Sequence, residues 1–130
     1  MTDAAQLAVR YLLALCIWRE ARGEIALGKR FVGQVIENRK NDPRWPHDYV
    51  QVIVQPLQFS SFNSNDPNAR LFPSPDDKAW PDCVAAADDV LTGDTVFTTA
   101  NHYHVRGLEP SWANPAKITE IVGHHVFYRL

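Results

Sequence analysis

The feature that most constrains the fold is an apolar helix near the N-terminus that runs directly into charged residues. Every position from Tyr11 to Trp18 is apolar. Steps of three and four residues return to the same side of a helix, so this run is apolar nearly all round. Such a helix is stable only when other elements cover it. The sequence therefore predicts a buried helix within a compact domain, extended toward the N-terminus by a stripe with Leu7 and Tyr11 and stopped near Gly23.

The charged residues after this run, REARGE at 19–24, place a carboxyl group at the edge of the predicted core. Glu20 continues the buried face that contains Ile17. Burial and the C-terminal end of the helix dipole both raise the pKa of such a carboxyl, while Arg19 and Arg22 are expected to lower it. A glutamate balanced in this way holds a proton near neutral pH and can act as a general acid. The alternative is a surface glutamate paired with arginine.

Glu24 is the second acidic residue of this stretch. It either shares the site of Glu20 or pairs with Arg22 or Lys29. Carboxylates four residues apart on a helix lie on the same side, whereas a two-carboxylate glycosidase places them on opposite sides of one bond. The spacing therefore favours a single catalytic acid with a supporting carboxylate.

The rest of the chain predicts one domain over residues 1–130, mainly helical with a small sheet toward the C-terminus. Apolar periodicity, caps and β-branched runs place the elements. Helices are expected at Leu27–Lys40, at Tyr49–Val54 with Asp48 as cap, and at 78–92 closed by Gly93; 55–75 is expected to be a long ordered loop, and Thr95–Tyr103 and Ile118–Tyr128 to be short strands.

Charge and cysteine content exclude several classes of protein. The net charge is -2 and the basic residues are dispersed, so neither nucleic acid nor a membrane surface is an expected partner. The N-terminal apolar run is interrupted by Arg10 and is too short for a signal peptide or a membrane span. Cys16 and Cys83 are expected to be buried free thiols.

His102 and His104 alternate along a predicted strand and could bind zinc, but a third ligand would have to come from elsewhere. No metal or other cofactor is expected. Several aromatic residues could line a sugar groove, although large aromatic side chains are more often core residues: Trp45, Trp80, Tyr103, Trp112 and Tyr128.

Taken together, an ordered series of motifs resembles the cell wall hydrolase family of spore-cortex-lytic enzymes. The series begins with E-A-R-G-E at 20–24 and V-x-x-V-I-x-N-R at 32–39, and continues with Q-F-S at 58–60. It ends with H-Y-H at 102–104, P-x-W-A at 110–113 and, within 118–129, a tail similar to the pattern I-G-x-H-x-F-Y. The resemblance covers about residues 12–129.

The resemblance implies a compact, lysozyme-like α+β domain that acts on peptidoglycan. It implies cleavage between N-acetylmuramic acid and N-acetylglucosamine by a lytic transglycosylase, with Glu20 as the catalytic acid and base. The chain is expected to be a monomer. Contacts with the glycan are expected from Glu24, Gln58, Ser60, Tyr103 and His104. Departures near Trp18, Arg19 and Ile25 bear on substrate preference rather than on the reaction.

Three other functions stay open at this point. A hydrolytic muramidase would use the same Glu20, a zinc amidase would be built on His102 and His104, and a glycan-binding module would have lost the chemistry. Without a recognisable signal or anchoring module, the domain fits either a phage endolysin that is released from the host cytosol or a trimmed enzyme of wall remodelling.

Overall fold

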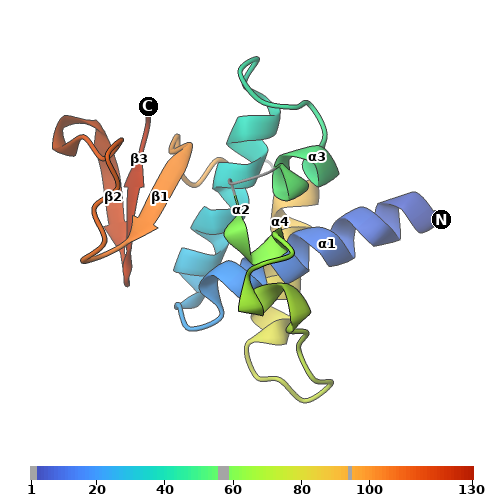
Figure 1. Ribbon diagram of the computed structural model, residues 1–130. Coiled ribbons are helices and arrows are strands. Elements are labelled where there is room, and N and C mark those ends of the chain that lie inside the picture. Colours follow the sequence, from blue (N-terminus) through green and yellow to red (C-terminus); the bar gives the residue numbers. More distant parts are fainter. Residues whose placement is uncertain (1–2, 56–58, 94) are drawn as a thin grey trace.

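The computed structural model describes residues 3–55, 59–93 and 95–130. Figure 1 shows the helices gathered on one side and a small sheet beside them. The four α-helices are α1 (Ala4–Ala21), α2 (Ala26–Lys40), α3 (Tyr49–Val54) and α4 (Trp80–Thr92). The strands are β1 (His102–Val105), β2 (Ile118–Val122) and β3 (His125–Tyr128), and three 3-10 turns are η1 (Ser60–Phe62), η2 (Pro67–Arg70) and η3 (Pro115–Lys117).

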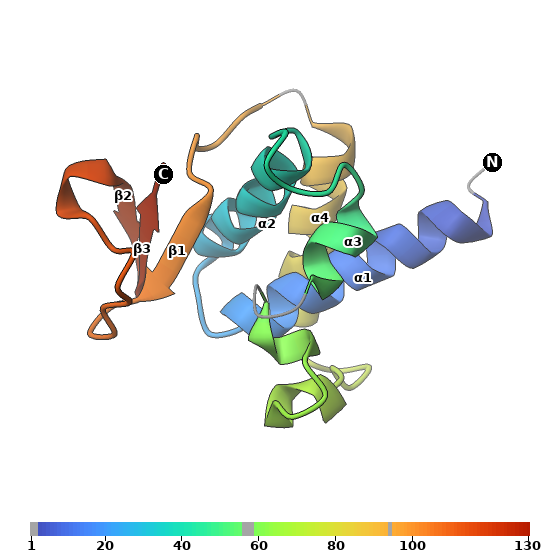
Figure 2. The same cartoon turned by 45° about the horizontal axis from the view of Figure 1, so that its top comes forward.

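Helix α1 is the central helix that the apolar run predicts. Its residues from Leu13 to Arg19 are buried, and α2 and α4 pack against it. Leu7 and Tyr11 are exposed instead, at 52% and 46%. The views agree that the N-terminal part of α1 extends beyond the neighbouring helices (Figures 1 and 2), although the Tyr11 ring still packs on that of Trp80, with centroids 5.6 Å apart.

The predictions for the other helices are confirmed. The Asp48 side chain caps α3 by accepting the backbone N–H of Gln51, and Gly93 is the C-cap of α4. Close packing accounts for the glycine within α2, because a Cβ at Gly33 would lie 2.8 Å from Val90 Cγ2. Both cysteines are buried free thiols, as expected.

The sheet is smaller than predicted and ordered β1-β3-β2, with both pairs antiparallel. The strand expected at Thr95–Tyr103 is wrong over its first part, since β1 begins only at His102. In that part of the chain, the Asn38 side-chain amide donates hydrogen bonds to the carbonyls of Thr98 and Ala100, so these carbonyls bind a side chain of α2 instead of a neighbouring strand. Residues 118–128 form two strands rather than one, because Gly123, with φ +57, turns the chain between β2 and β3.

The long ordered loop is confirmed for the residues described, and α1 holds it in place. The buried Arg19 guanidinium donates to the carbonyls of Leu71, Ser61 and Ala69 at 3.1, 3.3 and 3.1 Å. The same group lies 4.7 and 4.9 Å from the ring centroids of Phe62 and Phe72. Residue Arg19 therefore fixes η1 beside the C-terminal end of α1. Among the residues described, no helix is both long enough and apolar enough to cross a bilayer.

Candidate active site

Glu20 lies in the last turn of α1, where three elements meet. Helix α1 brings the carboxyl group, η1 lies against the end of the helix, and β1 brings a tyrosine. The hydroxyl of Tyr103 donates a hydrogen bond to Glu20 Oε1 at 2.6 Å. Because side chains alternate along a strand, Tyr103 points toward the helices, where its ring packs on those of His125 and Phe127 at 5.0 and 5.7 Å.

The environment of Glu20 favours its protonated form. Burial raises the pKa of the Glu20 carboxyl and outweighs the hydroxyls of Tyr103 and Ser61, which lower it; nearby Asp66 raises it and Arg39 lowers it. The C-terminal end of α1 acts in the same direction as burial. A partly buried carboxyl with a raised pKa and one fixed oxygen can deliver a proton to a ligand from its other oxygen.

Ser61 is buried beside Glu20 and favours the charged carboxylate. Its hydroxyl nevertheless makes no hydrogen bond of good geometry with any group in the described part of the chain. The contact that fixes the Glu20 carboxyl is therefore the Tyr103 hydroxyl, 2.6 Å from Oε1, and Ser61 acts on the pKa of Glu20 by its proximity.

The cation that acts on Glu20 is Arg39 of α2, not the neighbouring arginines that the sequence suggested. Arg39 is buried, its Nε donates to the Asn101 carbonyl at 2.7 Å, and its guanidinium lies 5.4 and 5.2 Å from the rings of Trp45 and Phe59. Arg19 binds the loop as described above. Arg22 donates to the Arg19 carbonyl and to Asn68 Oδ1.

Glu24 lies beyond the end of α1, and its carboxylate is bound at the turn between β2 and β3. Oε1 accepts the backbone N–H of His124 and Oε2 lies 2.7 Å from His124 Nδ1. These contacts lower the pKa of the Glu24 carboxyl despite its burial. A Cβ at Gly123 would lie 2.7 Å from Glu24 Oε1. The structure therefore gives Glu24 a role in joining the sheet to α1, and a glycan contact from it stays a prediction.

The structure does not bring the other predicted glycan contacts together around Glu20. His104 is on β1 next to Tyr103 but faces the opposite side of the sheet, where Nε2 lies 2.7 Å from the Tyr128 hydroxyl and the ring packs on Trp112. Ser60 begins η1. Gln58 lies outside the described residues. Of the predicted set, the structure brings together Glu20 and Tyr103.

The histidine pair offers no metal centre of the kind considered from the sequence. Nδ1 of His102 contacts Asn101 Oδ1 and Nδ1 of His104 contacts the Val105 carbonyl, each at 2.8 Å. Within residues 3–55, 59–93 and 95–130, no group of three or more His, Cys, Asp or Glu side chains could hold a metal ion.

Sequence reasoning missed two residues near Glu20. Arg39 is the last residue of the V-x-x-V-I-x-N-R motif. The motif therefore pointed to this arginine, but no role was predicted for it from the sequence. Ser61 carried no such signal, because only the assembled fold places η1 beside the end of α1.

Two curated proteins that are similar to this chain in sequence are both spore cortex-lytic enzymes. The spore cortex-lytic enzyme of Halalkalibacterium halodurans is 30% identical over 119 residues, 89% of this chain and 33% of that protein. The spore cortex-lytic enzyme of Bacillus subtilis is 29% identical over 119 residues, 89% of this chain and 36% of that protein. The chain thus spans about a third of the length of these relatives.

Two solved structures share the fold. One is the catalytic domain of the germination-specific lytic transglycosylase SleB from Bacillus anthracis, with a TM-score of 0.77, 22% identity, and coverage of 99% of this chain and 100% of that one. The other is the catalytic domain of Bacillus cereus SleB, with a TM-score of 0.75, 25% identity, and coverage of 99% and 94%. The predicted compact α+β fold is confirmed.

A family match covers most of the chain. Residues 23–128 match the family described as Cell Wall Hydrolase, beginning three residues after Glu20. The resemblance identified from the motifs is thereby confirmed, and the chain belongs to the Cell Wall Hydrolase family.

Proposed function

We propose that this domain cleaves peptidoglycan between N-acetylmuramic acid and N-acetylglucosamine as a lytic transglycosylase, with Glu20 as its acid and base. The observation that carries the proposal is the state of Glu20: a carboxyl whose pKa is raised by burial and which is fixed through one oxygen by Tyr103 at 2.6 Å. Membership of the Cell Wall Hydrolase family and the names of the spore cortex-lytic relatives support peptidoglycan as the substrate.

The chemistry proceeds in two proton transfers at one residue. Glu20 first donates its proton to the glycosidic oxygen, so the bond from the muramic C1 breaks and an oxocarbenium-like centre develops. The C6 hydroxyl of the same sugar then attacks C1, and the Glu20 carboxylate takes the hydroxyl proton. The product carries a 1,6-anhydro ring, and Glu20 is again protonated.

A single carboxyl group suffices for this reaction, which agrees with the surroundings of Glu20. The Glu24 carboxylate is bound by His124, with its Oε1 2.7 Å from the backbone nitrogen, so it is engaged at the turn and is no candidate nucleophile. Tyr103 and Arg39 stabilise the charged form of Glu20 that exists between the two proton transfers.

The test compares Glu20→Gln with Glu109→Gln, a matched change at an exposed glutamate. Release of soluble fragments from purified peptidoglycan is expected to fall by about a thousandfold or more in Glu20→Gln, at the scale of losing a general acid, and to be unchanged in Glu109→Gln. A Glu20→Gln protein that works at the parent rate would remove Glu20 from the mechanism. Loss of activity with a chelator would instead favour an amidase that uses zinc.

The biological setting of the reaction stays a prediction. Spore cortex is the substrate suggested by the names of the relatives. Phage lysis and wall remodelling would use the same chemistry. Digesting cortex and vegetative walls in parallel would rank these substrates.

A further inference from the structure

A row of aromatic rings lies on the face of the sheet opposite to Tyr103. The ring of His102 has its centroid 5.8 Å from that of Trp45 and 5.0 Å from that of Trp112, and His104 lies 5.7 Å from Trp112. His102 and Trp112 are partly exposed. Tryptophan is enriched at interfaces where part of the ring is packed and part meets water, and contiguous exposed apolar surface is a mark of ligand-binding grooves.

The hydrogen bonds of Asn101 fix which nitrogen of His102 carries a proton. The Asn101 amide nitrogen donates to the Leu130 carbonyl, and its Oδ1 accepts the Leu130 N–H, both at 2.9 Å. Oδ1 is therefore an acceptor, and His102 Nδ1, 2.8 Å away, must be the donor. In the neutral ring this leaves a lone pair on Nε2, which makes no hydrogen bond with any described residue.

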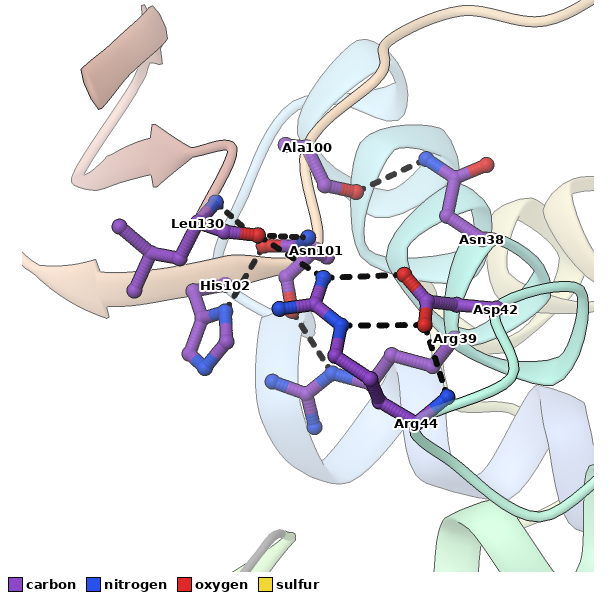
Figure 3. A network of polar contacts seen from close by, with 8 residues as sticks. All are labelled: Asn38, Arg39, Asp42, Arg44, Ala100, Asn101, His102 and Leu130. Carbon is purple, nitrogen blue, oxygen red and sulfur yellow. Dashed lines mark hydrogen bonds and ion pairs between the residues drawn. The ribbon is translucent and has the colours of Figure 1, made fainter.

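His102 stays neutral over the ordinary range of pH. Burial and the nearby cations Arg39 and Arg44 lower the pKa of His102 to about 4. Figure 3 shows the contact between the His102 ring and Asn101, with Arg39 and Arg44 beside the imidazole. The free nitrogen is thus a fixed acceptor, which suits a hydroxyl or amide N–H donor and not a carboxylate.

We propose that His102 and Trp112 form a saccharide subsite, in which the Trp112 ring packs on the apolar face of a sugar and His102 Nε2 accepts a hydrogen bond from it. Trp45 supports the subsite from behind, since Arg44 and Arg39 lie over its ring at 4.7 and 5.4 Å. This inference rests on the proposed function, because the sugar belongs to the glycan strand cleaved at Glu20.

The position of the subsite connects it to Glu20. His102 precedes Tyr103 on β1, roughly 3.3 Å along the strand. Strand β1 is at the edge of the sheet, so a ligand that follows this edge meets side chains of both faces. A glycan strand at Glu20 can therefore pass Tyr103 and continue over His102 and Trp112.

The experiment titrates tetra-N-acetylchitotetraose into the Glu20→Gln protein, which is expected not to turn over glycans. His102→Phe keeps a ring and removes the acceptor, so binding should weaken about fivefold. Trp112→Ala should weaken it about tenfold. Leu108→Ala, an exposed apolar change in the same loop, should leave the dissociation constant unchanged. In the first protein, the ¹⁵N resonance of His102 Nε2 should move on binding, as for a nitrogen that accepts a new hydrogen bond.

The outcomes separate the subsite from the proposed function. If the parent cleaves peptidoglycan while both variants bind the tetrasaccharide as tightly as Glu20→Gln alone and the Nε2 resonance stays fixed, the subsite is wrong and the function stands. If the parent releases no glycan fragments but the variants lose binding as described, the subsite stands and the function fails. Thermal unfolding of each variant must match the parent for either conclusion.

Discussion

Replacing Tyr103 by phenylalanine isolates the contact that holds Glu20. The change removes the hydroxyl that donates to Oε1 at 2.6 Å and leaves the ring that packs on Phe127. A hydrogen bond to a charged group contributes about 1.5–3 kcal/mol, and we take the lower end because water can reach a partly exposed carboxyl. A loss of about 1.5 kcal/mol corresponds to roughly one pH unit.

The direction of the effect follows from which form of Glu20 the contact stabilises. The Tyr103 hydroxyl favours the carboxylate and so lowers the pKa of Glu20. Without it, the acid keeps its proton to higher pH. The basic limb of the kcat/KM profile, where a general acid loses its proton, should therefore move upward by about one pH unit in Tyr103→Phe.

The assay follows the release of soluble glycan from peptidoglycan between pH 4 and 9, about five units that span the limb. Tyr49→Phe is the matched control, since Tyr49 lies on α3 and makes its ring contact with Lys40. A basic limb that stays in place in Tyr103→Phe, or moves equally in Tyr49→Phe, would refute the reasoning.

Three further predictions test the surroundings of the site. Glu20→Gln should be more stable to denaturant than the parent at neutral pH and equal to it below the usual carboxyl pKa, because burial raises the pKa of Glu20 and folding therefore opposes its charged form; a constant difference at all pH values would contradict this. Gly123→Ala should lose about 1–2 kcal/mol of unfolding free energy, since φ is +57 and the new Cβ would meet Glu24 Oε1; equal unfolding curves would refute it. Arg19→Lys removes the guanidinium that donates to three loop carbonyls, so we expect a loss of about 2 kcal/mol of unfolding free energy and faster proteolysis within 59–72. An unchanged rate of proteolysis would contradict this.

The helical part of the fold was predictable because its signals are local. A run that is apolar all round required burial from Leu13 onward, and Asp48 and Gly93 marked helix ends by their own chemistry. The predictions that were wrong depend on tertiary contacts. The sequence of residues 95–101 carries no sign that the Asn38 amide donates hydrogen bonds to their carbonyls, which a strand would use to pair with its neighbour.

The candidate site was predictable in part for the same reason. The face of Glu20 follows from helical spacing within α1. The partner of its carboxyl comes from β1, and its cation comes from α2, and only the assembled fold brings Tyr103 and Arg39 to it. Arg19 and Arg22 are nearer in sequence, but their side chains point to the loop at 59–72 instead.

The most direct test of the central claim is a mass spectrum of the soluble products that the parent and Glu20→Gln release from purified peptidoglycan. The account predicts 1,6-anhydromuramic ends from the parent and no fragments from Glu20→Gln. Reducing ends from the parent, heavier by one water, would contradict the transglycosylase reaction, and equal release by both proteins would contradict the role of Glu20.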